Sequence, residues 1–362
     1  MKLSDVAGRA SRPEVTPLLA GDPRELGGYR LQGRIGRGGM GTVYLGATRS
    51  GRLLAVKVIS PEAAAEDKNR ERFRREVKAA AEIRSPRTAT VIDWDVDAAT
   101  PWLASEYLPW PNLADVVREN GPLPEPAVRE LALGLAEALA AIHRAGLVHR
   151  DVKPSNILIG EDGPRLIDLG IVTDPDGPTL TYSQEVLGTP QYMSPEQALG
   201  LPVTAASDIW SLGAVVYAAA TGTALFGRGA PPEVTYRVVH ARPLLGALAE
   251  GLRPLVRACV AKDPADRPEL SRVAELLRAG DGGREPGQRV RWPWSGGARP
   301  LPGGRPGADR LAGPRSGADR QGGDAEGARR RRRRLPGRAV TVGLAVATAA
   351  AVAGAALAAY LA

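Results

Sequence analysis

The hydrophobic pattern divides the chain into a folded body and flanking segments of different character. Between residues 28 and 279, short runs of alternating β-branched and aromatic residues come first, and long helical patterns follow. The runs TVYLGAT (42–48) and LLAVKVI (53–59) predict two strands, and the charged stretch 65–85 predicts a helix. The sequence therefore predicts a packed domain in which strands precede helices.

The segments before and after this body have a polar composition. Residues 1–27 are polar and contain prolines, which predicts a flexible lead-in. Residues 280–338 are rich in Gly, Pro and Arg and contain almost no large apolar side chains. Such a composition cannot bury enough surface to offset the entropy of ordering, so we expect a disordered linker there.

The last 24 residues, 339–362, contain no charged side chain. A helix of this length would be about 36 Å long, enough to cross a hydrocarbon core of about 30 Å. Twelve of these residues are Ala and only seven are Val or Leu, so the drive for insertion is weak. We expect one transmembrane helix over 339–362; the alternative is a buried helix of a soluble domain.

The formal charge of the chain is +8, but its distribution is uneven. The run Arg329–Arg334 and Arg338 supply seven of these charges, which leaves +1 for all other residues. A nucleic-acid-binding domain would spread its cations over a folded face. We therefore expect no nucleic-acid partner.

Two further observations concern the cellular compartment. The single cysteine, Cys259, cannot form an intrachain disulfide and is expected to be a small buried residue. The first residues contain no apolar stretch as long as that of a signal peptide. Both features fit a folded body in the cytosol.

A glycine-rich segment supplies the first candidate chemistry. Gly36, Gly38 and Gly41 form a G-x-G-x-x-G pattern, which dinucleotide-binding folds also use before a helix. Here a strand follows, so the loop is expected to join two antiparallel strands. Glycine backbone at such a loop can approach phosphate groups closely and present N–H groups to them.

Lys57 lies within the apolar run 53–59 and requires a partner, because burying an unpaired ammonium is costly. A triphosphate and a carboxylate would both satisfy it. In the predicted helix, Glu76 follows Phe73 by three residues and therefore lies near the packed face. Glu76 is our candidate for the carboxylate.

The segment GLVHRDVKPSNILIGEDGPRLIDLGIV (146–172) identifies the class. It contains an H-R-D-x-x-x-x-N pattern and, twelve residues after its Asn, a D-x-G; the matching positions are His149, Arg150, Asp151, Asn156 and Asp168. Together with the glycine loop and Lys57, about two thirds of the chain resembles the bacterial eukaryotic-like Ser/Thr protein kinases, of the membrane-anchored actinobacterial type. The resemblance implies an α+β, bilobal fold with a β-rich small lobe (28–108) and a helical large lobe (109–279).

The resemblance also implies a catalytic arrangement. Asp151 would orient the hydroxyl of a protein substrate, and Lys153 would offset charge on the transferred phosphoryl group. Asn156 and Asp168 would hold Mg²⁺, with Mn²⁺ as an alternative. Lys57 would bind the phosphates of ATP and pair with Glu76 in the active state. The implied ATP-binding residues are Ile35, Gly36, Gly38, Gly41, Val43, Ala55, Lys57, Glu106 and Leu108.

Other positions matching the family imply support and regulation. His149, Asp208 and the ion pair of Glu196 with Arg267 would be structural. Arg150 before Asp151 is typical of kinases whose activation segment is ordered by phosphorylation. The implied phosphorylation sites are Thr181 and Ser183, with Thr179 as a weaker candidate, and Thr189 together with Lys153 indicates Ser or Thr as the acceptor.

The sequence departs from the family pattern at three positions. Leu169 replaces the common Phe after Asp168, but it still fills an apolar slot. Ser105 stands at the gatekeeper position, so a roomier back pocket is expected. Trp110 replaces a common Gly beyond the hinge; it either alters the rim of the nucleotide pocket or packs on the surface, and we favour the surface.

Three functions from different classes follow: an active membrane-tethered kinase, a pseudokinase scaffold and a nucleic-acid-binding protein. The presence of Lys57, Asp151 and Asp168 argues against the scaffold. Because a kinase needs cytosolic ATP, the arginine run before residue 339 fits an orientation signal that also contacts anionic lipid. The expected location is the cell membrane, single-pass, with a cytoplasmic kinase domain; a homodimer through the small lobe stays open.

Overall fold

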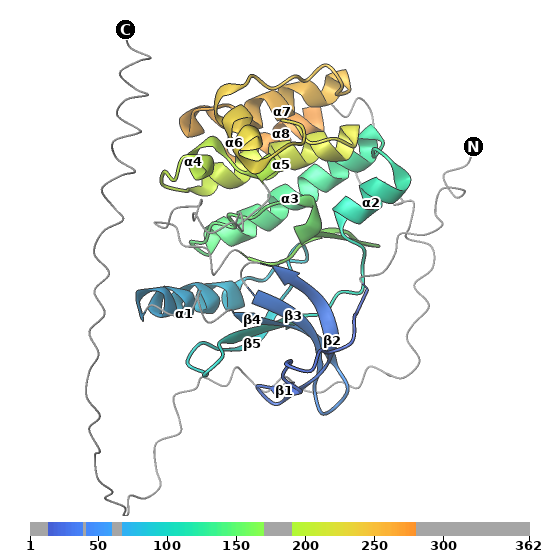
Figure 1. The fold of residues 1–362 in the computed structure, drawn as a ribbon. Coiled ribbons are helices and arrows are strands. Elements are labelled where there is room, and N and C mark those ends of the chain that lie inside the picture. Colours follow the sequence, from blue (N-terminus) through green and yellow to red (C-terminus); the bar gives the residue numbers. More distant parts are fainter. Residues whose placement is uncertain (1–13, 39–40, 60–66, 170–189, 280–362) are drawn as a thin grey trace, which may run out of the picture. The chain divides into compact units, whose positions relative to one another are not determined.

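The computed structural model describes residues 14–38, 41–59, 67–169 and 190–279. They form a lobe built around a sheet and a larger lobe built from helices (Figure 1). The α+β, two-lobed arrangement is thereby confirmed. The predicted disordered linker, the predicted transmembrane helix and the predicted phosphorylation sites lie outside the described residues.

The small lobe contains an antiparallel sheet in the order β1-β2-β3-β4-β6-β5 and one helix, α1 (Figure 1). The predicted strand over 53–59 is confirmed as β4, and the strand predicted over 42–48 is β3. The elements are β1 (Glu25–Leu26), β2 (Tyr29–Gly38), β3 (Gly41–Ala47), β4 (Leu53–Ile59), α1 (Asp67–Glu82), β5 (Val91–Asp95) and β6 (Trp102–Glu106).

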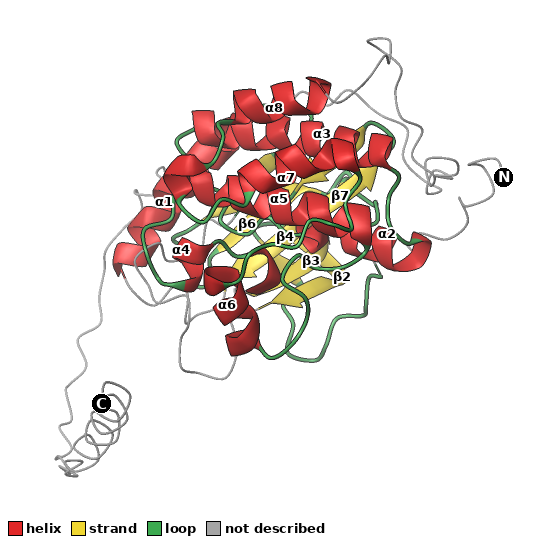
Figure 2. Cartoon of the chain, turned by 90° about the horizontal axis from the view of Figure 1, so that it is seen from above, coloured by secondary structure: helices red, strands yellow, loops and turns green. Residues whose placement is uncertain are grey.

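In its described residues, the large lobe is helical apart from one hairpin, β7 (Ile157–Gly160) with β8 (Gly163–Leu166). Its helices cover the strands in the view from above (Figure 2). They are α2 (Leu113–Asn120), α3 (Glu125–Arg144), α4 (Pro195–Ala198), α5 (Ala205–Thr221), α6 (Pro231–His240), α7 (Arg253–Cys259) and α8 (Leu270–Ala279), with short 3-10 turns at Pro154–Asn156, Pro190–Tyr192, Glu250–Leu252 and Pro264–Asp266.

The helices follow from their sequence patterns and end residues. In α1, Phe73, Val77 and Ala80 recur on one face and pack with Ile59 of the sheet. Helix α5 is buried over most of its length, as expected for an apolar helix at the centre of a lobe, and it ends at Gly222 with a φ of 73°. Helices α3, α5 and α7 share one large core that includes the buried thiol of Cys259, as predicted.

The apolar core continues between the lobes at two leucines. Leu147 and Leu169 pack against the core of the large lobe and also against the cluster under α1. Leu169, which replaces the more common Phe, thus occupies the expected apolar slot and joins the two lobes.

The segment before β2 corrects one prediction. We expected residues 1–27 to be a flexible lead-in, but residues 14–26 pack against the small lobe. Thr16 exchanges two backbone hydrogen bonds with Arg34 of β2. Asp22, only 9% exposed, accepts hydrogen bonds from Arg34 Nε at 2.6 Å and from the Tyr44 hydroxyl at 2.8 Å. The hydrogen bonds from Arg34 hold the pKa of Asp22 far below its ordinary range, against the opposing effect of desolvation.

Within the described residues, no helix combines the length and apolar character that crossing a membrane requires. The candidate span at 339–362 is not among those residues, so it stays a prediction.

Candidate active site

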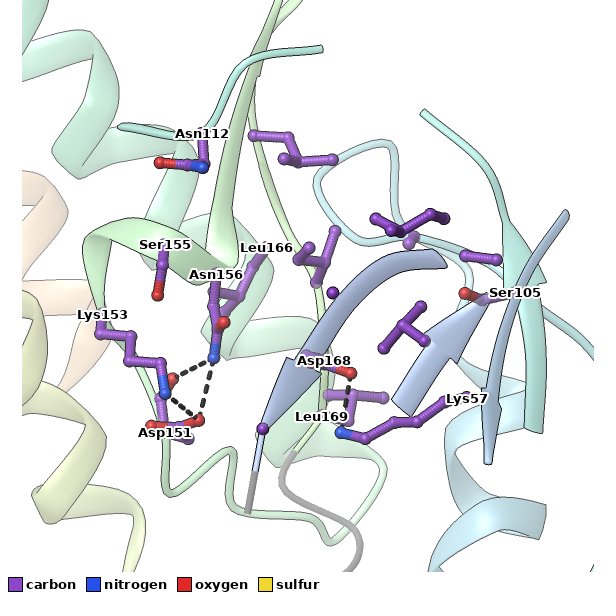
Figure 3. Close-up of a pocket in the computed structure, with 18 of the residues that line it drawn as sticks. Lys57, Ser105, Asn112, Asp151, Lys153, Ser155, Asn156, Leu166, Asp168 and Leu169 are labelled. Carbon is purple, nitrogen blue, oxygen red and sulfur yellow. Dashed lines mark hydrogen bonds and ion pairs between the residues drawn. The ribbon is translucent and has the colours of Figure 1, made fainter. Parts of the chain in front are cut away.

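A cleft of about 530 Å³ lies between the glycine-rich strands and the helical lobe. The close-up in Figure 3 shows Lys57 and Asp168 at one end, with Asp151, Lys153 and Asn156 on the opposite wall. Every residue expected to bind the nucleotide lines this cleft: Ile35, Gly36, Gly38, Gly41, Val43, Ala55, Lys57, Glu106 and Leu108. The volume suits a ligand of the size of a nucleotide.

The three glycines of the hairpin β2–β3 serve different purposes. Gly41 has a φ of 140°, and a Cβ there would lie 1.9 Å from the carbonyl oxygen of Val58, so the fold itself requires glycine. At Gly36 and Gly38 a Cβ would meet no atom within 4 Å. The protein backbone does not require glycine at those two positions, which leaves the close approach of a ligand as the physical reason for it.

Lys57 projects from β4 into the cleft and contacts the carboxylate of Asp168 at 2.9 Å (Figure 3). Desolvation in the cleft disfavours the ionised form of Asp168. The ammonium groups of Lys57 and Lys153 and the nearby His149 outweigh this effect and lower the pKa of Asp168. An ionised carboxylate beside an ammonium is thus available for a phosphate-bound cation.

Glu76 does not contact Lys57 in this structure, contrary to the pair expected for the active state. Its Oε1 instead accepts a hydrogen bond from Arg150 Nη1 at 3.2 Å, while Lys57 pairs with Asp168. The two cations thus have different carboxylate partners, Asp168 for Lys57 and Glu76 for Arg150. Arg150 lines the cleft, whereas Glu76 is not among the described residues that line it.

Asp151 is held at the cleft by two neighbours in its own loop. Its Oδ2 contacts Lys153 Nζ at 2.8 Å and accepts from Asn156 Nδ2 at 3.0 Å (Figure 3). The side chain keeps 27% of its surface exposed, so a hydroxyl group can reach it. A carboxylate in this setting can orient a hydroxyl and accept its proton.

The same contacts prepare Asn156 for a cation. Its amide nitrogen donates both to the backbone oxygen and to the carboxylate of Asp151, at 2.9 and 3.0 Å. The amide oxygen is left as a hard ligand, like the carboxylate of Asp168. Residues 14–38, 41–59, 67–169 and 190–279 contain no cluster of three or more His, Cys, Asp or Glu side chains. The amide oxygen of Asn156 and the carboxylate of Asp168 are oxygen donors of the kind that Mg²⁺ takes beside phosphate oxygens.

Asp208 braces the catalytic loop from α5 below it. Its carboxylate, 1% exposed, accepts the backbone N–H groups of His149 at 2.8 Å and Arg150 at 2.9 Å and contacts His143 Nε2 at 2.7 Å. His149 Nε2 donates to the carbonyl oxygen of Ile167 at 3.1 Å, which links this loop to the segment carrying Asp168.

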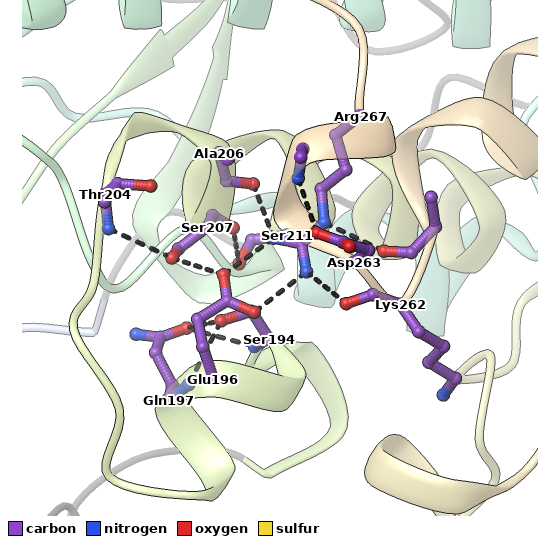
Figure 4. Close-up of polar contacts among 12 residues, drawn as sticks. Ser194, Glu196, Gln197, Thr204, Ala206, Ser207, Ser211, Lys262, Asp263 and Arg267 are labelled. Carbon is purple, nitrogen blue, oxygen red and sulfur yellow. Dashed lines mark hydrogen bonds and ion pairs between the residues drawn. The ribbon is translucent and has the colours of Figure 1, made fainter.

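Glu196 and Arg267 form a buried bidentate ion pair, in which the two N–O distances are 2.6 and 2.8 Å (Figure 4). Desolvation disfavours the charged carboxylate, but hydrogen bonds from Arg267 and Ser207 outweigh it and lower the pKa of Glu196. This pair fixes α4 to the loop before α8, away from the cleft.

Trp110 differs from the surface position that we favoured. Its ring packs closely against Gly160 and lines the cleft, and the Arg165 guanidinium lies over the ring, 4.9 Å from the ring centroid. Arg165 also contacts Glu106 at 3.2 Å. Arg165 thus joins Trp110 to Glu106, two residues that line the cleft. Ser105, at the back of the cleft, lies opposite Ala55 in the strand register, so both side chains there are small.

The sequence reasoning missed two polar residues that hold the loop. His143 contacts Asp208, but a His at the end of a helix gives no specific signal. Gln197 donates from Nε2 to the carbonyl oxygen of Arg150 at 2.8 Å. Its signal was available, because Ser194 and Gln197 have the S-x-x-Q spacing of a capping box.

The expected phosphorylation sites Thr179, Thr181 and Ser183, and Thr189 with them, are outside the described residues.

Comparison with known protein families gives one match over most of the chain. The family described as the protein kinase domain matches residues 29–277. A crystal structure of the kinase domain of Mycobacterium tuberculosis PknI matches with a TM-score of 0.58 and 26% identity, covering 74% of this chain and 100% of that domain.

Curated bacterial proteins match the same part of the chain. The serine/threonine-protein kinase AfsK of Streptomyces griseus is 48% identical over 258 residues, covering 70% of this chain and 32% of AfsK. The probable serine/threonine-protein kinase PkwA of Thermomonospora curvata is 48% identical over 263 residues, covering 73% and 35%. The chain thus spans about a third of the length of these relatives.

Proposed function

The chain belongs to the protein kinase domain family, and from this premise we propose that it transfers the γ-phosphate of ATP to Ser or Thr hydroxyls of protein substrates. The observation that carries the proposal is the cleft itself. It brings Asp151, with Lys153 and Asn156 bonded to it, opposite Lys57 and Asp168. All the groups that phosphoryl transfer requires are retained, which argues against a scaffold without activity.

Each residue has a task that follows from its position. Lys57 binds phosphate oxygens once ATP competes for it with Asp168. Asn156 and Asp168 would hold Mg²⁺, or Mn²⁺ in its place, and the ion would supply positive charge at the phosphate oxygens. Asp151 accepts a hydrogen bond from the substrate hydroxyl and orients it for in-line attack. Lys153, next to Asp151, offsets charge on the phosphoryl group as it is transferred.

The direct test uses the purified full-length protein with labelled ATP, Mg²⁺ and a generic protein substrate. The wild type should incorporate label on Ser and Thr, and Asp151→Asn should lose activity by at least about 100-fold, the usual range for a general base. The matched control is Glu137→Gln, which removes the exposed carboxylate that pairs with Arg87 and lines no part of the cleft. This variant should stay active. Absence of incorporation by the wild type refutes the proposal.

We infer that the chain also regulates itself by phosphorylation in its activation segment, at Thr181 and Ser183. The contact of Arg150 with Glu76 supports this inference. A phosphate carries more charge than a carboxylate and would compete for Arg150. Glu76 would then be released to pair with Lys57, and Asp168 would be released to its cation.

The regulation is tested with the double variant Thr181→Ala, Ser183→Ala. It should lose both phosphate content and the rise in rate on preincubation with ATP. If Arg150 mediates the effect, Glu76→Gln should increase the rate of autophosphorylation, because Glu76 then competes less for Arg150. The same variant should lower the final activity by a larger factor, since the proposed active state also uses Glu76 at Lys57. An unchanged rate and phosphate content in the double variant refutes it.

We further propose that residues 339–362 anchor the kinase in a membrane, with the arginine run on the side of the kinase domain and in contact with anionic lipid. The protein should then resist carbonate extraction from membranes. Val352→Asp, a charge near the centre of the span, should release it, while Thr341→Ser should not. Extraction of the wild type by carbonate refutes the span. A homodimer through the small lobe stays a prediction.

A further inference from the structure

The residue before the catalytic Asp151 has an unusual backbone conformation. Arg150 has a φ of 65°, and Asp168 is the other non-glycine residue with positive φ among those described. A side chain with a Cβ avoids this region, so the conformation persists only where neighbours impose it. The contacts that hold Arg150 in this conformation therefore also set the direction in which the Asp151 side chain points.

The peptide that joins Arg150 to Asp151 is bonded at both of its polar groups. The Asp151 N–H donates to His149 Nδ1 at 3.3 Å. The Arg150 carbonyl oxygen accepts from Gln197 Nε2 at 2.8 Å. On the preceding peptide, the Arg150 N–H donates to Asp208 at 2.9 Å. Gln197 is thus the only side chain among those described that holds the carbonyl side of this peptide.

Gln197 is itself held in one orientation. Its Oε1 accepts from the Ser194 N–H at 3.0 Å and from the Ser194 hydroxyl at 3.2 Å, and its own N–H donates to Ser194 Oγ at 3.3 Å (Figure 4). Because the N–H of Ser194 can only donate, the atom facing it must be the amide oxygen. The Gln197 NH₂ group is thereby directed at Arg150.

The helix that carries Gln197 is a firm support. Gln197 is 6% exposed, Ser194 is fully buried, and the neighbouring Glu196 is locked by Arg267 (Figure 4). The start of α4 thus connects the end of the activation segment to the catalytic loop through one side-chain amide.

We propose that Gln197 is a positioning residue for the phosphoryl-transfer reaction: its amide holds the Arg150–Asp151 peptide so that the Asp151 carboxylate faces the substrate hydroxyl. The inference rests on the proposed kinase activity. It assigns Gln197 to the chemical step, because the residue acts on Asp151 and on no group that binds the nucleotide.

The test is Gln197→Glu, which replaces one heavy atom, the amide nitrogen with its two hydrogens, by a carboxylate oxygen and adds a negative charge. A Glu still accepts from Ser194 and keeps the capping box, but it presents an oxygen in place of the donor to the Arg150 carbonyl. With the full-length protein, kcat should fall about 10- to 100-fold, as for a small displacement of a reacting group. The KM for ATP should change less than about twofold, because Gln197 lines the cleft without being one of the residues expected to bind the nucleotide.

Ser194→Ala is the matched control. It removes the hydroxyl that caps α4 but leaves the contact of Gln197 with Arg150, so it should lower thermal stability more than kcat. A second readout does not depend on activity: hydrogen exchange in the peptide 149–153 should accelerate in Gln197→Glu and not in Ser194→Ala.

Rescue supplies a third comparison. In an Arg150→Gly background the positive φ no longer needs support, so the further loss of kcat caused by Gln197→Glu should shrink to less than about threefold. The inference is overturned if Gln197→Glu retains wild-type kcat, if both single variants lose stability and kcat in parallel, or if exchange at 149–153 is unchanged. A wild type without activity would instead refute the proposed function, and the exchange measurement would still decide the role of Gln197.

Discussion

Replacing Arg267 by Ala should remove a fully buried ion pair of the large lobe. The Arg267 side chain has no exposed surface, and it donates to both carboxylate oxygens of Glu196. It also donates to the backbone oxygens of Ala206, Ala261 and Lys262. The variant leaves a buried carboxylate with the Ser207 hydroxyl as its side-chain donor, and three carbonyl groups with a lost partner.

Breaking such a pair costs about 3–5 kcal/mol, which is a large share of a total stability of about 5–15 kcal/mol. For a domain of this size, the loss corresponds to a decrease of about 6–20 °C in the melting temperature. Urea unfolding followed by tryptophan fluorescence gives the free energy, and the buried Trp210, with the Arg267 guanidinium 5.2 Å from its ring, reports on the region.

Arg272→Ala is the control, because Arg272 forms an ion pair of the same chemistry with Glu275 at the surface, with side chains 61% and 59% exposed. It should cost less than about 0.5 kcal/mol. The double variant Glu196→Gln, Arg267→Ala should be at least about 1 kcal/mol more stable than the sum of the single losses, since no buried charge is left alone. Equal losses for Arg267→Ala and Arg272→Ala would refute the reasoning.

Trp110→Ala should raise the KM for ATP about three- to tenfold, equivalent to about 0.7–1.4 kcal/mol, with kcat unchanged; an unchanged KM would place the ring outside the nucleotide site. Gly41→Ala should lower the melting temperature because of its positive φ, whereas Gly36→Ala should keep the melting temperature and raise the KM for ATP; the opposite order would contradict the different purposes of the two glycines. Because the pKa of Glu196 is lowered in the folded state, its contribution is present above the ordinary value of 4.5 and is lost as the pH falls through the folded pKa, so the stability difference between wild type and Glu196→Gln should shrink below about pH 4.5 in urea titrations. Burial raises the pKa of the Cys259 thiol to about 12, so a thiol reagent should label it only in denaturant, and rapid labelling of the native protein would contradict its burial.

Parts of the site were predictable because their geometry is local. Asp151, Lys153 and Asn156 lie within six residues, and a loop that forms at all brings them together. The strand over 53–59 was also predictable, because an apolar run of this length is typical of a buried strand, and it contains Lys57. These features depend on residue types and spacing, both of which the sequence contains.

The pairing of charges was not predictable in the same way. In the structure Lys57 pairs with Asp168 and Glu76 pairs with Arg150, whereas the sequence predicted Lys57 with Glu76. The four residues are far apart in the chain, and their spacing does not say which carboxylate lies beside which cation. A sequence defines the partners that are available, while the conformation selects among them.

The prediction of a flexible lead-in failed for residues 14–26, for a different reason. Polar residues with prolines usually indicate disorder, but Asp22 finds its partner Arg34 on a strand that could not be inferred from residues 14–26. Gly33 also lets the segment approach, because a Cβ there would lie 2.5 Å from the side chain of Val15. Contacts of this kind join two segments of the chain, and they produce no periodic pattern of apolar residues in the sequence of either segment.

The packing of residues 14–26 bears on how the domain is best produced as a recombinant fragment. The family match starts at residue 29, and a fragment cut there would lack Asp22. Arg34, with 20% of its side chain exposed, would lose its carboxylate, and the Tyr44 hydroxyl would lose its acceptor. Both lie on the strands that form the glycine-rich hairpin. Low activity in such a fragment would therefore reflect a damaged small lobe, and expression should begin before residue 14.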